Sequence, residues 1–208
     1  MKKNKVLFLI FLSLSIFLKT FPELITDIFY LPIDVENRRV LKQSYINPYG
    51  DFGIWRKPYK GISGHYHTGI DFKNPGKKKG AVEPIFACGV GIVKSVIKNG
   101  PSSTVIIEHT LRNNRKVYSV YLHISDIMVN PNDTVDERTV LGSFIDYKNL
   151  DKWGEFLNHL HFEMLKVQPK FVGMDKGDSI FNSYSINIKK KDSIDDYYFD
   201  PKIFFIRY

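Results

Sequence analysis

Short runs of apolar residues, separated by Gly, Pro and Asn, fill the chain between residues 85 and 142. The runs cover residues 85–88, 90–97, 104–108, 116–124 and 140–142. Short apolar or alternating runs bounded by turn residues are typical of β-strands. No long amphipathic helical period occurs in this span. We therefore predict a mainly β domain.

One further strand is predicted over His159-Leu160-His161-Phe162-Glu163. Side chains of a strand alternate between its two faces, so His159 and His161 would share one face while Leu160 and Phe162 point the other way. That face could hold one imidazole beside a metal and the other beside a substrate. A strand that merely contains two histidines is an equally good interpretation of the stretch alone.

The first twenty residues have a different pattern. Lys2, Lys3 and Lys5 precede an apolar run over residues 6–18, and Lys19 closes it. Thirteen apolar residues match the core of a signal peptide and are short for a membrane span. No clean small-residue cleavage site follows. We expect residues 1–20 to direct export, either as a cleaved signal peptide or as a signal anchor that holds the chain at the membrane through residues 6–18.

The remaining chain divides at about residue 48. Residues 21–48 show no sustained period and contain Pro22 and Pro32, so they are predicted to form a stalk or packing arm. Residues 49–208 are predicted to form one domain, a size that can bury its own core. The single cysteine, Cys88, rules out an internal disulfide and is expected to be a small buried residue.

The charge of the chain depends partly on its leader. The formal charge is +8, but residues 1–20 contain four lysines and no acid, which leaves 26 basic and 22 acidic residues, a net charge of +4. This excess is small for a nucleic-acid-binding domain, so no nucleic-acid partner is predicted.

Candidate metal ligands occur in Gly64-His65-Tyr66-His67-Thr68-Gly69-Ile70-Asp71-Phe72. In a straight strand, His67 and Asp71 would lie about 13 Å apart, too far to share one ion. A bend is therefore required, and Gly69 is the residue that allows it. His161 can complete a set of two imidazoles and one carboxylate, which leaves a fourth tetrahedral position on zinc for water.

Two more histidines are candidates for proton transfer. His123 ends the run over residues 116–124, and His159 shares its face with His161. Neither is required as a ligand, so both could move protons or stabilise an oxyanion. The alternative for His123 is a strand-end imidazole that only binds backbone.

Taken together, these motifs resemble the lysostaphin-type (LytM-like) zinc metallopeptidases. The resemblance rests on His67-x-x-x-Asp71, Tyr121-x-His123 and His159-x-His161 in this order, with Gly69-Ile70-Asp71, Gly89-Val90-Gly91 and Asp200-Pro201 around them. It implies an antiparallel β domain of the duplicated hybrid motif type with an open groove. It further implies zinc on His67, Asp71 and His161, with His123 and His159 beside the metal-bound water and the tetrahedral intermediate. The implied activity is an endopeptidase that cuts peptidoglycan stem peptides or cross-bridges outside the cytoplasmic membrane.

The chain also departs from that family pattern. Insertions are expected near residues 143–158 and 167–198, where groove walls would lie, so substrate preference does not carry over. Glu163 could orient an imidazole from behind, or it could have an ordinary packing role. Two alternatives stay open: a non-catalytic envelope protein that binds peptidoglycan or activates an amidase, and a metallopeptidase that acts on a protein.

Overall fold

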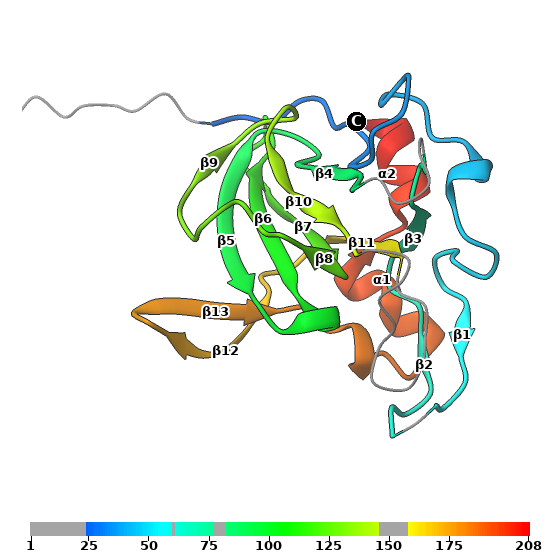
Figure 1. Cartoon of the computed structure of the whole chain (residues 1–208). Coiled ribbons are helices and arrows are strands. Elements are labelled where there is room, and N and C mark those ends of the chain that lie inside the picture. Colours follow the sequence, from blue (N-terminus) through cyan, green and yellow to red (C-terminus); the bar gives the residue numbers. More distant parts are fainter. Residues whose placement is uncertain (1–23, 60, 77–81, 146–157) are drawn as a thin grey trace, which may run out of the picture.

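The computed structural model describes residues 24–59, 61–76, 82–145 and 158–208 of the chain. The architecture is mainly β, with antiparallel sheets and two short helices, which confirms the predicted fold class (Figure 1). The expected leader over residues 1–20 and most of the first expected insertion, residues 146–157, lie outside the described residues.

A seven-stranded antiparallel sheet forms the centre of the domain. Its strand order is β14-β11-β7-β6-β5-β9, and β3 also pairs with β11. The strands are β3 (Ile70–Lys73), β5 (Gly91–Ile97), β6 (Thr104–Thr110), β7 (Lys116–Leu122), β9 (Thr134–Val135), β11 (His159–Leu165) and β14 (Tyr198–Phe199).

Three smaller sheets and short helical segments surround this sheet. One sheet has the order β4-β10-β8, with β4 (Pro84–Phe86), β8 (Ile124–Ser125) and β10 (Val140–Phe144). The two hairpins are β1 (Trp55–Arg56) with β2 (His65–Tyr66), and β12 (Lys170–Asp175) with β13 (Asp178–Asn182). The helices are α1 (Ile194–Tyr197) and α2 (Pro201–Arg207), and the 3-10 turns are η1 (Gln43–Tyr45), η2 (Gly100–Ser102), η3 (Ser185–Asn187) and η4 (Lys191–Ser193).

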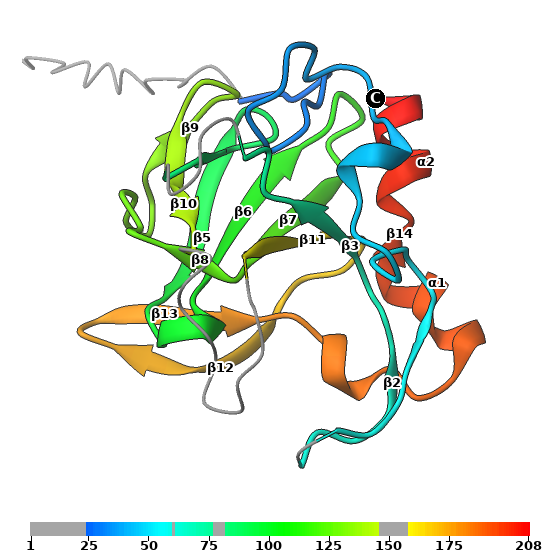
Figure 2. The same ribbon diagram turned by 45° about the vertical axis from the view of Figure 1, so that its right-hand side comes forward.

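Alternation along the strands gives the central sheet a hydrophobic cluster on each face. In β6, Val105 and Ile107 enter one cluster, while Ile106 enters the other. The first cluster lies between the central sheet and the β4-β10-β8 sheet. The second is covered by the late segment of the chain, from which Phe181, Ile188, Ile194 and Tyr198 are buried. Figures 1 and 2 show the β12-β13 hairpin and α2 at opposite ends of the domain.

Residues 24–48 pack against the domain. Phe29, Leu31, Ile33 and Ile46 are almost completely buried in the first cluster. Arg38 fastens this segment, because its guanidinium donates hydrogen bonds to the carbonyl oxygens of Leu31, Ala87 and Glu137. The position of the segment is therefore set by buried apolar area and by bonds to the β domain.

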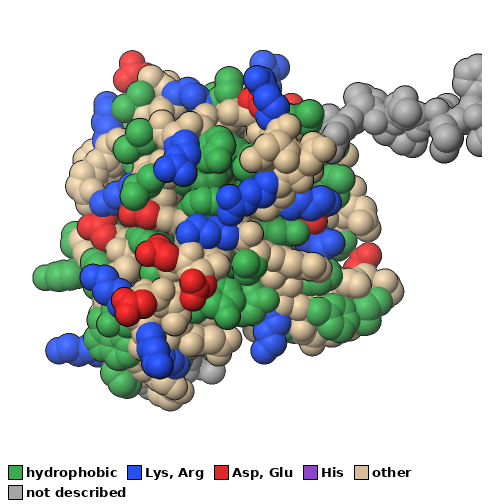
Figure 3. Space-filling model, turned by 180° about the vertical axis from the view of Figure 1, so that it is seen from behind, with side chains coloured by type: hydrophobic (Ala, Val, Ile, Leu, Met, Phe, Trp, Pro, Cys, Tyr) green, Lys and Arg blue, Asp and Glu red, His purple; other side chains and the backbone are tan. Residues whose placement is uncertain are grey.

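The described part of the chain has no helix with the length and hydropathy needed to span a membrane. On the face seen in Figure 3, Lys and Arg side chains are interspersed with acidic and hydrophobic ones, so positive charge is not gathered into one stripe there.

His109 is a buried histidine whose role is structural. Its side chain lies inside the domain, where Nδ1 donates to the Val90 carbonyl oxygen at 2.7 Å and Nε2 accepts from the Ser119 hydroxyl at 2.8 Å. Burial lowers the pKa of His109 to about 4, although the bond to Val90 acts in the opposite direction. The folded protein therefore holds this ring neutral as a core residue.

The buried neutral ring predicts acid lability. An unfolded chain binds a proton at this histidine near pH 6.5, so its contribution to stability is complete above that pH and is lost as pH falls towards 4. The full loss is about 3 kcal/mol, since each pKa unit is worth about 1.4 kcal/mol. We expect the free energy of unfolding, measured with urea at pH 7.5 and 4.5, to fall by roughly 2 kcal/mol more in wild type than in His109→Gln. Equal losses in the two proteins would contradict this account.

Candidate metal centre and active site

The segment from His67 to Asp71 bends as its residue types require. β2 ends at Tyr66, β3 begins at Ile70, and the chain bends at Gly69 between them. A Cβ atom at Gly69 would lie 2.2 Å from the carbonyl oxygen of Phe162 in β11, so only glycine allows this close approach. The bend brings His67 Nε2 to 3.0 Å from Asp71 Oδ1.

β11 adds the third member of a compact cluster. Asp71 and His161 are paired across β3 and β11, which sets His161 Nδ1 3.0 Å from Asp71 Oδ1 and 2.9 Å from His67 Nε2. All three residues are buried. The structure therefore brings together His67, Asp71 and His161, which are separated by up to 94 positions in the sequence.

Each of the three side chains has inner atoms, which face the other two members of the cluster, and an outer atom, which faces away from them. Each outer atom has a hydrogen-bond partner. His67 Nδ1 donates to the carbonyl oxygen of Asp51 at 2.8 Å, and His161 Nε2 donates to Glu163 Oε1 at 2.9 Å. Arg56 donates to Asp71 Oδ2 at 2.6 Å. A carbonyl or carboxylate oxygen can only accept, so the outer nitrogen of each imidazole carries a hydrogen, and the inner nitrogen holds a lone pair when the ring is neutral. Their inner nitrogens then present lone pairs to one another and to a carboxylate oxygen.

This arrangement fits a small divalent ion such as zinc. Two imidazoles and a carboxylate are typical ligands of an open zinc site, and ligands around tetrahedral zinc lie about 3.3 Å from one another. The three inner atoms lie 2.9–3.0 Å apart. Because three lone pairs converge on one point, a cation is the species that this pocket stabilises.

Burial and neighbouring charged groups together set the pKa values of the cluster. Burial alone would raise the pKa of Asp71, but hydrogen bonds from His161 and His67 hold it well below its usual value. Burial alone would lower the pKa of His161, but its bonds to Asp71 and Glu163 outweigh this effect and raise the pKa to about 9. Burial is the main cause of the lowered pKa of His67. A proton on His161 Nδ1 and a bound cation therefore compete for the same position beside Asp71.

His123 and His159 form a second pair beside this cluster. Their ring centroids are 4.9 Å apart, and His159 Nε2 lies 3.9 Å from Asp71 Oδ1. His123 lies between β7 and β8 with a φ of 67°, a left-handed conformation that is uncommon outside glycine and often occurs at functional sites. Its Nδ1 donates to the Pro101 carbonyl oxygen at 2.6 Å, so Nε2 keeps a free lone pair. Burial, followed by the charge of His159, lowers the pKa of His123 to about 4.

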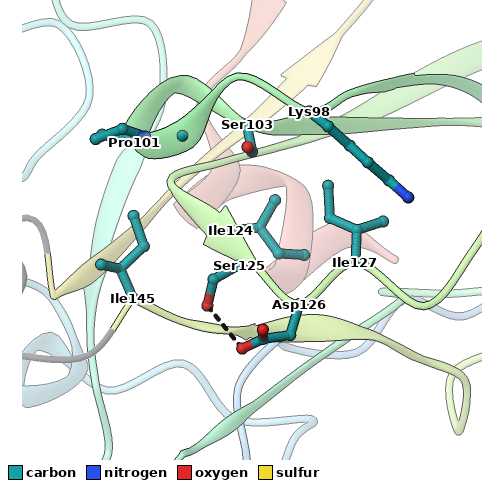
Figure 4. Close-up of a pocket in the computed structure, with 9 residues that line it drawn as sticks. Lys98, Pro101, Ser103, Ile124, Ser125, Asp126, Ile127 and Ile145 are labelled. Carbon is teal, nitrogen blue, oxygen red and sulfur yellow. Dashed lines mark hydrogen bonds between the residues drawn. The ribbon is translucent and has the colours of Figure 1, made fainter.

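One cavity joins the two groups of side chains. It has a volume of about 470 Å³ and is lined by His67, Asp71, His123, His159 and His161. The β1-β2 hairpin forms one wall, η3 contributes Ser185 and Ile186, and η2 contributes Ser102. A larger hollow of about 610 Å³ is lined by Pro101, Ile124, Ser125 and Asp126, and no histidine is among its described lining residues (Figure 4). The chemistry therefore belongs to the smaller cavity.

Several residues of the site were not predicted from sequence. Arg56 and the backbone of Asp51 reach the cluster only because the β1-β2 hairpin folds over it, and no local spacing signals that contact. Glu163 does contact an imidazole from behind, one of the two roles considered for it, and Thr68 also donates to its Oε1 at 2.5 Å. Ile186 lies in the cavity wall, within the second expected insertion.

A comparison with protein families decides the wider relationship. The model of a family described as Peptidase family M23 matches residues 65–179, more than half of the chain. The chain belongs to peptidase family M23. All three clustered residues, together with His123 and His159, lie inside the matched range of this M23 chain.

Solved structures with similar folds include a zinc-containing peptidase from Vibrio cholerae, with 22% identity and a TM-score of 0.47, covering 75% of this chain and 39% of that one. LytU has 21% identity and a TM-score of 0.45, and the match covers 79% of this chain and 86% of LytU. The catalytic domain of lysostaphin from Staphylococcus simulans has 20% identity and a TM-score of 0.43, and the match covers 75% of this chain and 89% of the lysostaphin domain. The M23 chain described here thus spans under half of the Vibrio cholerae protein's chain. A comparison with curated proteins gives no match.

Proposed function

We propose that this M23 chain is a zinc-dependent endopeptidase that hydrolyses peptide bonds in peptidoglycan. The observation that carries the proposal is the convergence of His67 Nε2, Asp71 Oδ1 and His161 Nδ1 within 3.0 Å of one another, in a cavity that also holds His123 and His159. This combination supplies both a metal site and proton-transfer groups, whereas a binding protein requires neither.

His67, Asp71 and His161 would hold the zinc. The bound ion would supply a water of lowered pKa and polarise the scissile carbonyl. Asp51, Glu163 and Arg56 keep the three ligands in one orientation, since each occupies the outer atom of a different ligand. The inner atoms are therefore held ready for the ion.

His123 is the better placed proton acceptor of the second pair. Its Nδ1–H is used by the Pro101 carbonyl oxygen, which leaves a lone pair on Nε2. A proton taken up on Nε2 gives an imidazolium whose Nδ1–H still donates to Pro101. His159 then remains as the donor to the oxyanion that forms on the substrate.

We propose that the protein acts outside the cytoplasmic membrane. The lysines and the apolar run of residues 1–20 support export, and peptidoglycan lies outside that membrane. After export, the chain is either released by cleavage of the signal peptide or held at the membrane by residues 6–18. Fractionation of cells that express the full chain would distinguish these two outcomes.

The test of the proposed function combines metal content with digestion of purified sacculi. We expect one zinc per chain and the release of soluble fragments, whose masses identify the cleaved bond. A zinc-loaded protein that binds sacculi but releases nothing would establish the non-catalytic alternative. Cleavage of a protein substrate together with inert sacculi would establish the alternative of a protein-directed metallopeptidase.

Glu163 supports a prediction about zinc affinity. Its carboxylate is completely buried, Oε1 bonds to His161 Nε2, and Oε2 has no hydrogen-bond partner among the described residues. Removing its charge weakens the lone pair that His161 presents on its other nitrogen. We expect Glu163→Gln to lower zinc affinity about 10- to 100-fold, measured by competition with a chelator.

A surface variant provides the matched control for this measurement. Glu108 pairs with Lys94 and Lys116 on the sheet surface, away from the metal cluster. We expect Glu108→Gln to bind zinc as the wild type does. If the two variants showed the same affinity, Glu163 would have only a packing role.

A further inference from the structure

The cavity around the metal cluster has an unbalanced set of charges. Its described lining includes the cations Arg56 and Lys57, and the one carboxylate among the described lining residues is Asp71. The negative charge of Asp71 does not offset the other cation, because Oδ1 contacts both imidazoles and Oδ2 accepts from Arg56. Glu163 lies buried behind His161 and does not line the cavity. A substrate in this cavity therefore meets an excess of positive charge.

Lys57 is the cation of this set that is available to a ligand. Arg56 is committed to Asp71, whereas Lys57 is exposed and makes no ion pair or hydrogen bond within the described part of the chain. Lys57 follows directly on β1, which pairs with β2 through Arg56 and His65. Its backbone is thus placed by the same hairpin that places Arg56 against Asp71.

The cavity walls also present large apolar side chains. Tyr59 is 49% exposed, Ile62 is 40% exposed and Ile186 is 58% exposed, and all three line the cavity. Scattered exposed apolar residues need no explanation, but three in the wall of one cavity mark a ligand surface.

The wall that carries Ile186 is held in place. Ile188 is buried in the second hydrophobic cluster, and its carbonyl oxygen accepts from the backbone N–H of Tyr66 at 2.9 Å. Lys189 Nζ donates to the carbonyl oxygen of Gly64 at 2.9 Å. These bonds tie the late segment to the β1-β2 hairpin, so the two walls of the cavity keep a fixed spacing.

We infer that the cavity selects peptides with a free carboxylate and aliphatic side chains close to the scissile bond, and that Lys57 binds the carboxylate. This inference rests on the proposed function and narrows its substrate from peptidoglycan peptides in general to acidic stem peptides. A glycine-only bridge offers neither a charge for Lys57 nor a side chain for Ile186 and Tyr59. It is therefore a poor substrate.

The experiment compares three soluble substrates with the zinc-loaded wild-type protein. They are a cross-linked stem-peptide dimer with free carboxylates, the same dimer with its side carboxyl groups converted to carboxamides, and pentaglycine capped as an N-acetyl C-terminal amide so that it has no carboxylate. We expect kcat/KM to be about five-fold higher for the carboxylate dimer than for the carboxamide, the factor given by one charge pair near a protein surface. Pentaglycine should be cleaved most slowly.

Two lysine variants separate Lys57 from a general effect of net charge. Lys57→Gln should reduce the ratio between carboxylate and carboxamide dimers to about one. Lys98→Gln removes the same charge from an exposed residue that lines the other hollow, and it should keep the full ratio. A ratio near one in wild type, or an equal fall in both variants, would overturn the inference.

The outcomes also distinguish this inference from the proposed function. If the protein digested sacculi but cleaved the two dimers at equal rates, the inferred selection of a carboxylate would be overturned. The proposal that the protein is a peptidase would still stand. If sacculi and all three substrates resisted cleavage, the peptidase proposal would fail. Calorimetric binding of the two dimers would then decide the inference: tighter binding of the carboxylate dimer, lost in Lys57→Gln, would support it, and equal binding would overturn it.

Discussion

Replacing His67 with alanine should abolish zinc binding and hydrolysis together. The substitution removes Nε2, which lies 3.0 Å from Asp71 Oδ1 and 2.9 Å from His161 Nδ1. Two remaining ligands hold zinc poorly, and an open catalytic site uses three. The loss of a metal that stabilises developing charge by several kcal/mol corresponds to a fall in kcat/KM of about a thousand-fold or more. Zinc stoichiometry and the release of fragments from sacculi are the two measurements.

His65 offers the matched control for the metal measurement. It lies in β2, two residues before His67, and its Nδ1 bonds to the carbonyl oxygen of Ser63 at 2.9 Å. None of the hydrogen bonds or ion pairs that the structure describes for Asp71 and His161 involves His65. We expect His65→Ala to retain one zinc per chain. Continued hydrolysis by a metal-free His67→Ala protein would exclude the proposed mechanism, and loss of zinc from both variants would indicate that the β1-β2 hairpin had lost its fold.

The strands could be predicted because each depends on a local pattern, whereas the grouping of His67 and Asp71 with the distant His161 came from the chemistry of zinc ligands and from the family resemblance. Alternating apolar residues predicted β5, β6, β7 and β10, and the spacing of His159 and His161 placed both imidazoles on one face of β11. The bend at Gly69 followed from the premise that His67 and Asp71 share one ion, because a straight strand would separate them by about 13 Å. The structure closes that gap to 3.0 Å between ligand atoms.

The outer partners of the ligands could not be predicted, since they depend on contacts between distant segments. Arg56 reaches Asp71 because β1 pairs with β2. In the sequence, an arginine at this distance from His67 and Asp71 looks like an ordinary surface residue. Ile186 enters the cavity because Ile188 is anchored beneath Tyr66, which no sequence period indicates. His109 lies in the interior, where Val90 and Ser119 satisfy both of its nitrogens, and these partners from other segments have no local signal in the sequence.

The proposed distinction between metal ligands and proton-transfer groups leads to the second large expected effect. His123 contacts Pro101 and the ring of His159, and it makes no hydrogen bond to the three clustered ligands. We therefore expect His123→Ala to keep one zinc per chain and to lose about 10²- to 10⁴-fold in kcat, the range for removal of a general base. Zinc content and kcat measured on the same preparation test both statements.

The pH dependence of the wild-type protein and chemical rescue of His123→Ala test the role of His123 as proton acceptor. Burial and the neighbouring His159 lower the pKa of His123 to about 4, so the imidazole stays neutral and can accept a proton between about pH 5 and 8. The wild-type rate should then show no loss from protonation of His123 across that range. Added imidazole should partly restore hydrolysis by His123→Ala, because it replaces the missing acceptor in the space left beside His159. A zinc-loaded His123→Ala protein with wild-type kcat would move the proton acceptor to His159.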